Sequence, residues 1–403
     1  MNRCAIVGAG QAGLQVAESL RRGGFQGELV LLGDEASLPY QRPPLSKKYL
    51  LGEVDPARLL FRAAEHYAKL HVEVRLDTRV SLIDCATHEL VLADGNRLSY
   101  DRLALATGAR VRLLNVPGAE DPRVCYLRGI ADAEHIRRRL VDAARVVIVG
   151  GGFIGLEVAA IASSLGKEVT VIEAQSRVLP RVVAPLVSRF FETLHTRHGV
   201  RVLIEQQVSG LVHSANHTTV VTADGMRIEA ELIVIGIGIV PNVELAKAAG
   251  LACDAGILVD EFACASDPDI VAAGDCTRHR NLLYAQLHSL ESVQNAVDQA
   301  KIAAGTLLNA PLAYAQVPWF WSDQYDVKLQ IAGISNGYDD LVLRGVPEDG
   351  SFSVFYYAGA RVIAVDSINR PAEHMAARKI IAAGGISAKE QVANPATDLK
   401  SFL

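Results

Sequence analysis

The chain has few aromatic residues and no closely spaced pair of cysteines. Aromatic side chains make up 6% of the 403 residues, whereas 50% of the residues are hydrophobic and 33 are glycine. An aliphatic, glycine-rich composition is typical of parallel sheets that are covered by helices. The six cysteines are scattered, without a CxxC pair or metal-ligand spacing. The sequence therefore predicts neither a redox-active dithiol of that kind nor a metal site.

The chain also lacks a strong net charge and a long apolar segment. Its formal net charge is -5, which favours neither nucleic acid nor an anionic membrane as a partner. The longest apolar run, residues 232–240, is too short to cross a bilayer. Residues 1–3 lead directly into the first expected strand, which leaves no room for a signal peptide. We therefore expect a cytoplasmic protein with no nucleic-acid or membrane partner.

A glycine-rich nucleotide-binding pattern occurs twice. Each copy has three glycines after a short apolar strand and before a helix-like stretch: Gly8, Gly10 and Gly13, then Gly150, Gly152 and Gly155. An acidic residue ends the next strand of each copy, Asp34 in the first and Glu173 in the second. The first glycine allows a tight turn, the second lets a pyrophosphate approach the backbone, and the third brings helix against strand. Two complete units predict two bound dinucleotides, between which electrons can pass.

The two copies predict an internal duplication of one α/β module. Similar apolar strands, at residues 102–109 and 232–242, close the two modules. After a helix expected over 289–308, the chain becomes strand-like from residue 318, and a last helix is expected over 371–383. We predict two Rossmann-like dinucleotide-binding domains, as in glutathione reductase-like flavoproteins, and a C-terminal α+β domain. The domains are predicted at 1–112 with 241–317, at 113–240, and at 318–403.

A proline-rich segment, residues 38–47, carries two cations, Arg42 and Lys47. In two-dinucleotide flavoenzymes this position covers the reactive edge of the flavin, where a cation stabilises the anionic reduced ring. Disulfide reductases of that architecture carry a redox-active cysteine pair here, and this chain has none. We therefore expect its electrons to leave to an external acceptor.

Five motifs together resemble the oxygenase-coupled, NADH-dependent ferredoxin reductases, the family of putidaredoxin reductase and of the biphenyl dioxygenase reductase components. They are residues 8–13, 42–47 and 150–157, Gly274-Asp275, and residues 319–324. The resemblance covers essentially the whole chain. It implies an enzyme that takes hydride from NADH onto FAD and passes electrons singly to a [2Fe-2S] ferredoxin. That ferredoxin would serve a cytochrome P450 or a Rieske oxygenase.

The resemblance also implies site residues. Those implied for FAD are Gly8, Gly10, Ala12, Gly13, Asp34, Arg42, Lys47, Thr107, Gly108, Gly274, Asp275, Glu291, Ser292, Val293 and Trp321. Those implied for NADH are Gly150, Gly152, Phe153, Ile154, Gly155, Glu157, Glu173, Gly236 and Gly238. Lys47, Glu157 and Trp321 are the expected catalytic residues, with Lys47 paired to Glu157. Whether Trp319 or Trp321 contacts the flavin stays open at this point.

Other functions and details remain open from sequence alone. A rubredoxin reductase shares nearly all the motifs, and an NADH oxidase or an apoptosis-inducing-factor-like redox switch would share both nucleotide sites. Glu173 favours NADH over NADPH, although Arg177 lies four residues on. A basic patch for an acidic ferredoxin is a further candidate, formed by Arg278, His279, Arg280, Arg42, Lys47, Lys48 and Arg344. An ordinary mixed-charge surface explains these residues equally well, and the oligomeric state is left open.

Overall fold

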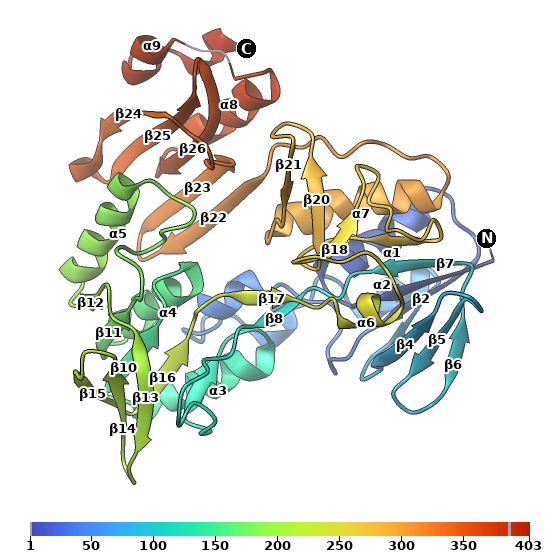
Figure 1. Cartoon of the computed structure of the whole chain (residues 1–403), viewed down its shortest axis with the longest axis horizontal. Helices are drawn as coiled ribbons and strands as arrows, with labels where there is room; N and C mark the ends of the chain where they lie inside the picture. Colours follow the sequence, from blue (N-terminus) through green and yellow to red (C-terminus); the bar gives the residue numbers. More distant parts are fainter. Residues whose placement is uncertain (1, 386–387) are drawn as a thin grey trace. The chain divides into compact units, whose positions relative to one another are not determined.

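The computed structural model describes residues 2–385 and 388–403 and divides the chain into two compact units, each discontinuous in sequence (Figure 1). Unit 1 comprises Met1–Gln41, Ala57–Arg110 and Val240–Pro318. Unit 2 comprises Arg42–Pro56, Val111–Ile239 and Trp319–Leu403. The proline-rich segment at Arg42 thus belongs to unit 2, although the sequence placed it within the first domain. In the described residues, no helix is long and apolar enough to cross a membrane.

Unit 1 is built on a five-stranded parallel sheet in the order β19-β7-β1-β2-β3. Its strands are β1 Arg3–Val7, β2 Glu28–Leu32, β3 Val72–Arg75, β7 Arg102–Leu105 and β19 Ile270–Ala272. Helices α1 (Gln11–Arg22) and α7 (Val293–Leu307) pack on one face, and the antiparallel sheet β4-β5-β6 covers the other. Because both faces are covered, β1, β2, β7 and β19 contain continuous apolar runs, whereas the edge strand β3 alternates valine with charged residues.

The remaining elements of unit 1 are short. They are β4 Val80–Asp84, β5 Glu89–Leu92, β6 Arg97–Ser99, β18 Ile257–Val259, β20 Thr277–Asn281, β21 Gln286–His288, α2 Ala64–Lys69 and α6 Glu244–Ala248. The expected helix over 289–308 begins four residues later than predicted, because Ser292 caps it by accepting a hydrogen bond from the Asn295 N–H. The chain changes unit at five places, and three of them lie within short elements: η2 Pro56–Leu59, β8 Ala109–Val111 and β17 Ile239–Pro241.

Unit 2 repeats the same architecture. Its parallel sheet has the order β12-β11-β10-β16-β9, with the strand before the glycine turn again at the centre. The elements are β9 Val124–Tyr126, α3 Ile130–Asp142, β10 Arg145–Val149, α4 Phe153–Ser164, β11 Glu168–Ile172, α5 Pro185–Arg197, β12 Arg201–Leu203, β13 Val208–His213, β14 Thr218–Thr222, β15 Arg227–Ala230 and β16 Leu232–Ile235. Strands β13-β14-β15 form the second small sheet. The predicted duplication is confirmed for four strands of each sheet, whereas the fifth strand is β19 in unit 1 and β9 in unit 2.

The C-terminal part of unit 2 is a five-stranded antiparallel sheet in the order β22-β23-β26-β25-β24. Its elements are β22 Trp319–Gln324, β23 Val327–Gly333, β24 Asp340–Val346, η3 Pro347–Asp349, β25 Ser351–Ala358, β26 Arg361–Ile368, α8 Pro371–Ala382, α9 Lys389–Ala393 and η4 Leu399–Phe402. Helix α8 packs against β23 and β26. The predicted strand-like region begins where expected, with β22, and the predicted last helix is α8.

Two residues of the predicted basic patch are not on the surface. Arg344 is 5% exposed, and its guanidinium donates to backbone carbonyls between Val392 and Thr397 and pairs with Glu373. His279 is 1% exposed, and burial lowers its pKa to about 4. Neither can present a positive charge to a partner at neutral pH, so this part of the patch prediction is wrong.

A buried carboxylic acid in the C-terminal sheet makes stability depend on pH. Asp366 is 0% exposed, accepts a hydrogen bond from Tyr356, and has its pKa raised by burial from 3.8 to about 7. The folded state therefore binds more protons than the unfolded state between these values, so stability falls as pH rises through them, by up to about 4 kcal/mol.

We expect Asp366→Asn, which is uncharged at every pH, to remove this decline. The measurement is the guanidinium chloride concentration at the midpoint of unfolding, determined for the FAD-loaded protein at pH 5 and at pH 8. The same fall in the variant as in the wild type would contradict the assignment to Asp366.

Candidate active site

The first glycine turn has one open position between two crowded ones. A Cβ on Gly8 would lie 2.1 Å from the Ala106 carbonyl oxygen, and one on Gly13 would lie 1.9 Å from that of Gly8. A Cβ on Gly10 meets no atom within 4 Å. Gly10 is also the N-cap of α1, where no side chain caps the helix. The open backbone and the helix N–H groups fit the pyrophosphate of a dinucleotide.

Of the other residues expected at FAD, Arg42, Lys47 and Trp321 lie in unit 2 and the rest lie in unit 1. Thr107 and Gly108 follow β7, Gly274 and Asp275 follow β19, and Asp34 follows β2, so they lie at the same carboxyl edge of the sheet as Gly8. Gly274 approaches α1 so closely that a Cβ there would lie 3.1 Å from the Cβ of Ala12. The expected segment at the start of α7 consists of an exposed Glu291, the capping Ser292 and the first helical residue, Val293.

The second glycine turn, in unit 2, has the same design. A Cβ on Gly150 would lie 2.4 Å from the Gly236 carbonyl oxygen, and one on Gly155 would lie 2.1 Å from that of Gly150. Around Gly152 the nearest atom would be 3.8 Å away. Helix α4 begins directly after it, at Phe153 and Ile154, and again no side chain caps it. This turn therefore also fits a dinucleotide pyrophosphate.

The acid after β11 is fixed by the backbone. Glu173 accepts hydrogen bonds from the N–H of Gly151 (2.7 Å) and of Gln175 (2.8 Å). Each carboxylate oxygen keeps a second lone pair with which to accept from a ribose hydroxyl. Arg177 donates its guanidinium N–H groups to the carbonyls of Val183 and Pro180 and to Ser188 Oγ. Arg177, the cation that left NADPH use open, is thus bonded to the loop that follows it and to the start of α5.

The structure brings together the cation and the acid that were expected to be catalytic. Lys47 Nζ lies 2.7 Å from Glu157 Oε2, and Ser46 Oγ donates to the same oxygen at 2.5 Å. Ser322 Oγ donates to Glu157 Oε1 at 2.6 Å. We call these four residues the Glu157 cluster. Ser46 ends η1 (Pro43–Ser46) and Lys47 follows it, Glu157 lies on α4, and Ser322 lies on β22. Glu157 is 2% exposed and satisfied on both oxygens, so its carboxylate is held in one orientation.

The two serines of the cluster were not predicted from the sequence. Ser46 directly precedes Lys47, and Ser322 directly follows Trp321, so both lie inside motifs that carried the family resemblance. Arg42, by contrast, was predicted, and its Nη1 donates to the carbonyl of Arg128 at 2.9 Å, also within unit 2.

The tryptophans lie together on β22. The ring centroids of Trp319 and Trp321 are 5.5 Å apart, as expected for alternate residues on one side of a strand. Trp319 packs against α8, with His374 at 5.9 Å and the Arg378 guanidinium at 5.1 Å from its ring. Helix packing thus explains the position of Trp319, which leaves Trp321 as the better candidate for contact with a cofactor.

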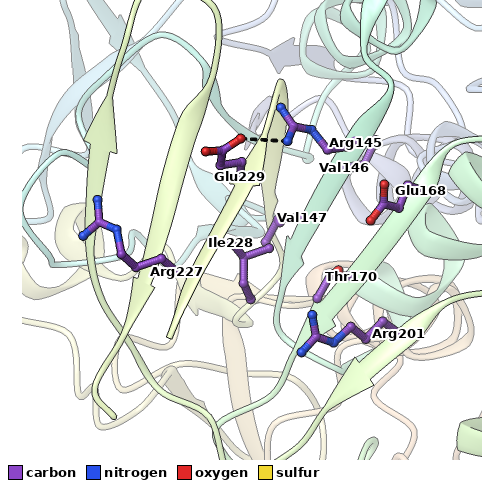
Figure 2. A pocket seen from close by; sticks show the side chains of 9 residues that line it. All are labelled: Arg145, Val146, Val147, Glu168, Thr170, Arg201, Arg227, Ile228 and Glu229. Carbon is purple, nitrogen blue, oxygen red and sulfur yellow. Dashed lines mark hydrogen bonds and ion pairs between the residues drawn. The ribbon is translucent and has the colours of Figure 1, made fainter. Parts of the chain in front are cut away.

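Unit 2 also has a polar cleft at the opposite edge of its parallel sheet. Figure 2 shows it lined by residues at the amino ends of β10, β11, β12 and β15, among them Arg145, Arg201 and Arg227. The glycine turn lies at the carboxyl end of β10. Arg145 is paired with Glu229 at 2.8 Å and with Glu231 at 2.7 Å. The cleft is therefore separate from the nucleotide turn.

Comparison with known proteins extends the similarity to the whole chain. Residues 2–300 match the pyridine nucleotide-disulphide oxidoreductase family, and residues 319–403 match the reductase C-terminal domain. Rhodocoxin reductase of Rhodococcus erythropolis is 44% identical over 98% of this chain and 93% of its own. The ferredoxin–NAD(+) reductase component of the anthranilate 1,2-dioxygenase system of Burkholderia cepacia is 41% identical over 99% of this chain and 98% of its own. The chain belongs to this family of ferredoxin reductases.

Solved structures of the family agree with the fold. The covalent putidaredoxin reductase–putidaredoxin complex matches with a TM-score of 0.97 at 41% identity, covering 100% of this chain and 98% of that chain. A rubredoxin-NAD(+) reductase of Pseudomonas putida is 39% identical over 91% of this chain and 95% of its own. The predicted family and fold class, two dinucleotide-binding modules with a C-terminal α+β part, are confirmed.

Proposed function

We propose that this ferredoxin reductase oxidises NADH and supplies single electrons to a [2Fe-2S] ferredoxin of an oxygenase system, and that it acts in the cytoplasm. The observation that carries the proposal is the pair of glycine turns, each with an open middle glycine at an uncapped helix N-terminus. When bound, FAD accepts hydride from NADH and releases the electrons one at a time. The predicted enzyme class, both cofactors and the kind of partner are those of the family.

The residues of each unit have separate tasks in this proposal. Unit 1 holds FAD at the Gly8–Gly13 turn, with Asp34 on the ribose and Asp275 on the ribityl chain. Unit 2 holds NADH at the Gly150–Gly155 turn, with Glu173 on the adenosine ribose.

Three residues of unit 2 act at the reacting groups. Lys47 places its ammonium at the flavin, where it stabilises negative charge, and Glu157 holds Lys47 in place at 2.7 Å. Trp321 would contact the flavin, as the family resemblance implies. Exclusion of water and fixed orientation are the protein's contribution, since the cofactors carry the redox chemistry.

The test is anaerobic mixing. The purified flavoprotein is reduced with NADH and mixed with oxidised [2Fe-2S] ferredoxin or with rubredoxin, and absorbance of the acceptor is followed. Fast bleaching of the ferredoxin supports the proposal. Bleaching of rubredoxin alone would assign the chain to the second candidate function, which the rubredoxin-NAD(+) reductase relative favours. Reduction of the flavin with neither acceptor reduced would point to an oxidase or a redox switch.

Glu173 is expected to set the preference for NADH. Glu173→Ala removes the acceptor for both ribose hydroxyls and the charge that repels a 2′-phosphate. We expect KM for NADH to rise about tenfold and the NADH-to-NADPH preference in kcat/KM to fall about as much, since two hydrogen bonds are lost. Steady-state kinetics with both nucleotides measure this. If kcat/KM for NADPH relative to NADH does not rise in Glu173→Ala, the assignment of Glu173 to the ribose site is contradicted.

A further inference from the structure

A series of buried hydrogen bonds leads away from the Glu157 cluster through unit 2. Beyond Ser322, the amide Nε2 of Gln324 lies 3.3 Å from Ser322 Oγ, and Gln324 Oε1 lies 2.8 Å from Nε2 of His195 on α5. The exposed fractions of Ser322, Gln324 and His195 are 1%, 1% and 0%. Because a buried polar group without a partner destabilises the fold, each member of the series has to find its hydrogen bond inside the protein.

The carboxylate fixes the direction of every bond in the series. An ionised Glu157 can only accept, so the single hydroxyl proton of Ser322 points at it. Ser322 Oγ must then accept from the Gln324 amide, whose oxygen therefore faces His195. His195 must donate from Nε2, which defines its tautomer. Burial lowers the pKa of His195 to about 4, so the ring is neutral at neutral pH and carries that one proton.

The outer end of the series is also held. Tyr325 Oη lies 3.4 Å from His195 Nδ1, the remaining acceptor, and the Tyr325 ring stacks on His198 at 3.7 Å. Tyr325 has a φ of 55°, a left-handed conformation that is unfavourable in a residue with a Cβ. The stack and the hydrogen bond keep the tyrosine there, in the turn between β22 and β23.

We propose that Ser322 and Gln324 are positioning residues for flavin reduction. With His195 they form a chain of aligned hydrogen bonds that ends on Glu157 Oε1 and keeps the carboxylate directed at Lys47. The inference rests on the proposed function of the Lys47–Glu157 pair. Aligned hydrogen bonds polarise one another, so each donor in the chain strengthens the last bond to the carboxylate.

Flavin reduction by NADH in stopped flow is the first test, made on the FAD-loaded protein. Ser322→Ala is expected to slow the rate constant at saturating NADH about tenfold, with the Kd for NADH changed less than about twofold, since one hydrogen bond to a charge is lost. Ser322→Thr keeps the hydroxyl and should restore the rate to within about threefold.

The matched control is Ser353→Ala. It removes another buried serine hydroxyl, bonded to Ser367, from the same sheet and should leave the rate unchanged. A Ser322→Ala rate equal to that of the wild type, or equal slowing by the control, would overturn the proposal.

A second readout needs no turnover. In ¹⁵N-histidine-labelled protein, NMR should find His195, assigned by its loss in His195→Asn, as a neutral ring with the proton on Nε2. In Ser322→Ala the orientation of Gln324 is no longer imposed, so a mixture of tautomers is expected. A proton on Nδ1 of His195 in the wild type would overturn the proposed chain of hydrogen bonds. If NADH fails to reduce the wild-type flavin, the proposed function is contradicted. The tautomer of His195 then still tests the proposed chain of hydrogen bonds.

Discussion

Glu157→Ala is expected to lower the rate constant of flavin reduction by NADH about a hundredfold while FAD stays bound. Its carboxylate lies 2.7 Å from Lys47 Nζ, and after its removal the ammonium retains the Pro43 carbonyl at 3.4 Å. The lysine then moves toward water, and a misplacement of about 1 Å in a reacting site costs about 10²-fold. Lys47→Ala removes the charge itself and is expected to have an effect of the same size. Stopped-flow absorbance of the flavin measures both.

Two further variants separate charge from packing. Glu157→Gln keeps the shape of the side chain and removes the charge that holds Lys47, so its rate should fall between those of the wild type and Glu157→Ala. Glu168→Ala removes an exposed carboxylate from β11, next to α4 in sequence, and should leave the rate unchanged. A Glu157→Ala protein that holds FAD and is reduced at the wild-type rate would contradict the role assigned to the pair.

Gly155→Ala is expected to raise the Kd for NADH about 30- to 100-fold and to leave the FAD content unchanged. The new Cβ would lie 2.1 Å from the Gly150 carbonyl oxygen, so α4 has to move away from the turn that receives the pyrophosphate. Gly13→Ala repeats the change in unit 1, at 1.9 Å from the Gly8 carbonyl oxygen, and is expected to lower the FAD content instead. Titration of each purified variant with NADH and with FAD gives both affinities.

The control for crowding is Gly210→Ala. There a Cβ would find the Pro117 carbonyl oxygen at 3.8 Å as its nearest neighbour, so the methyl group fits. Both affinities should stay at the wild-type values. Loss of FAD in Gly155→Ala, with NADH affinity kept, would reverse the assignment of the two nucleotides to the two units.

The glycine turns were predictable because their chemistry is local. Gly8 and Gly150 have φ values of 115° and 110°, which side chains with a Cβ rarely adopt, so their identity is dictated within a few residues of chain. The residues after β7, β16 and β19 followed from topology, since the carboxyl ends of neighbouring parallel strands meet at one edge.

The supports of Glu157 were not predictable in the same way. Ser322 lies 165 residues from Glu157 in sequence, and Gln324 lies 129 residues from His195. A serine or glutamine in a strand has no local feature that distinguishes a buried hydrogen bond from a solvated one. The prediction that Arg344 and His279 lie on a basic surface patch was wrong because polar residues are usually exposed, whereas these two are buried in the folded chain.

The origin of the fifth strand in each parallel sheet has a consequence for biosynthesis. The sheet of unit 2 takes β9 from just before its own module, so all five strands have been synthesised by residue 235. The sheet of unit 1 takes β19, at residues 270–272, from beyond that module. During synthesis on the ribosome, the sheet of unit 2 can therefore be completed before the sheet of unit 1. In the N-terminal module, the edge of β7 stays unpaired until β19 has been synthesised.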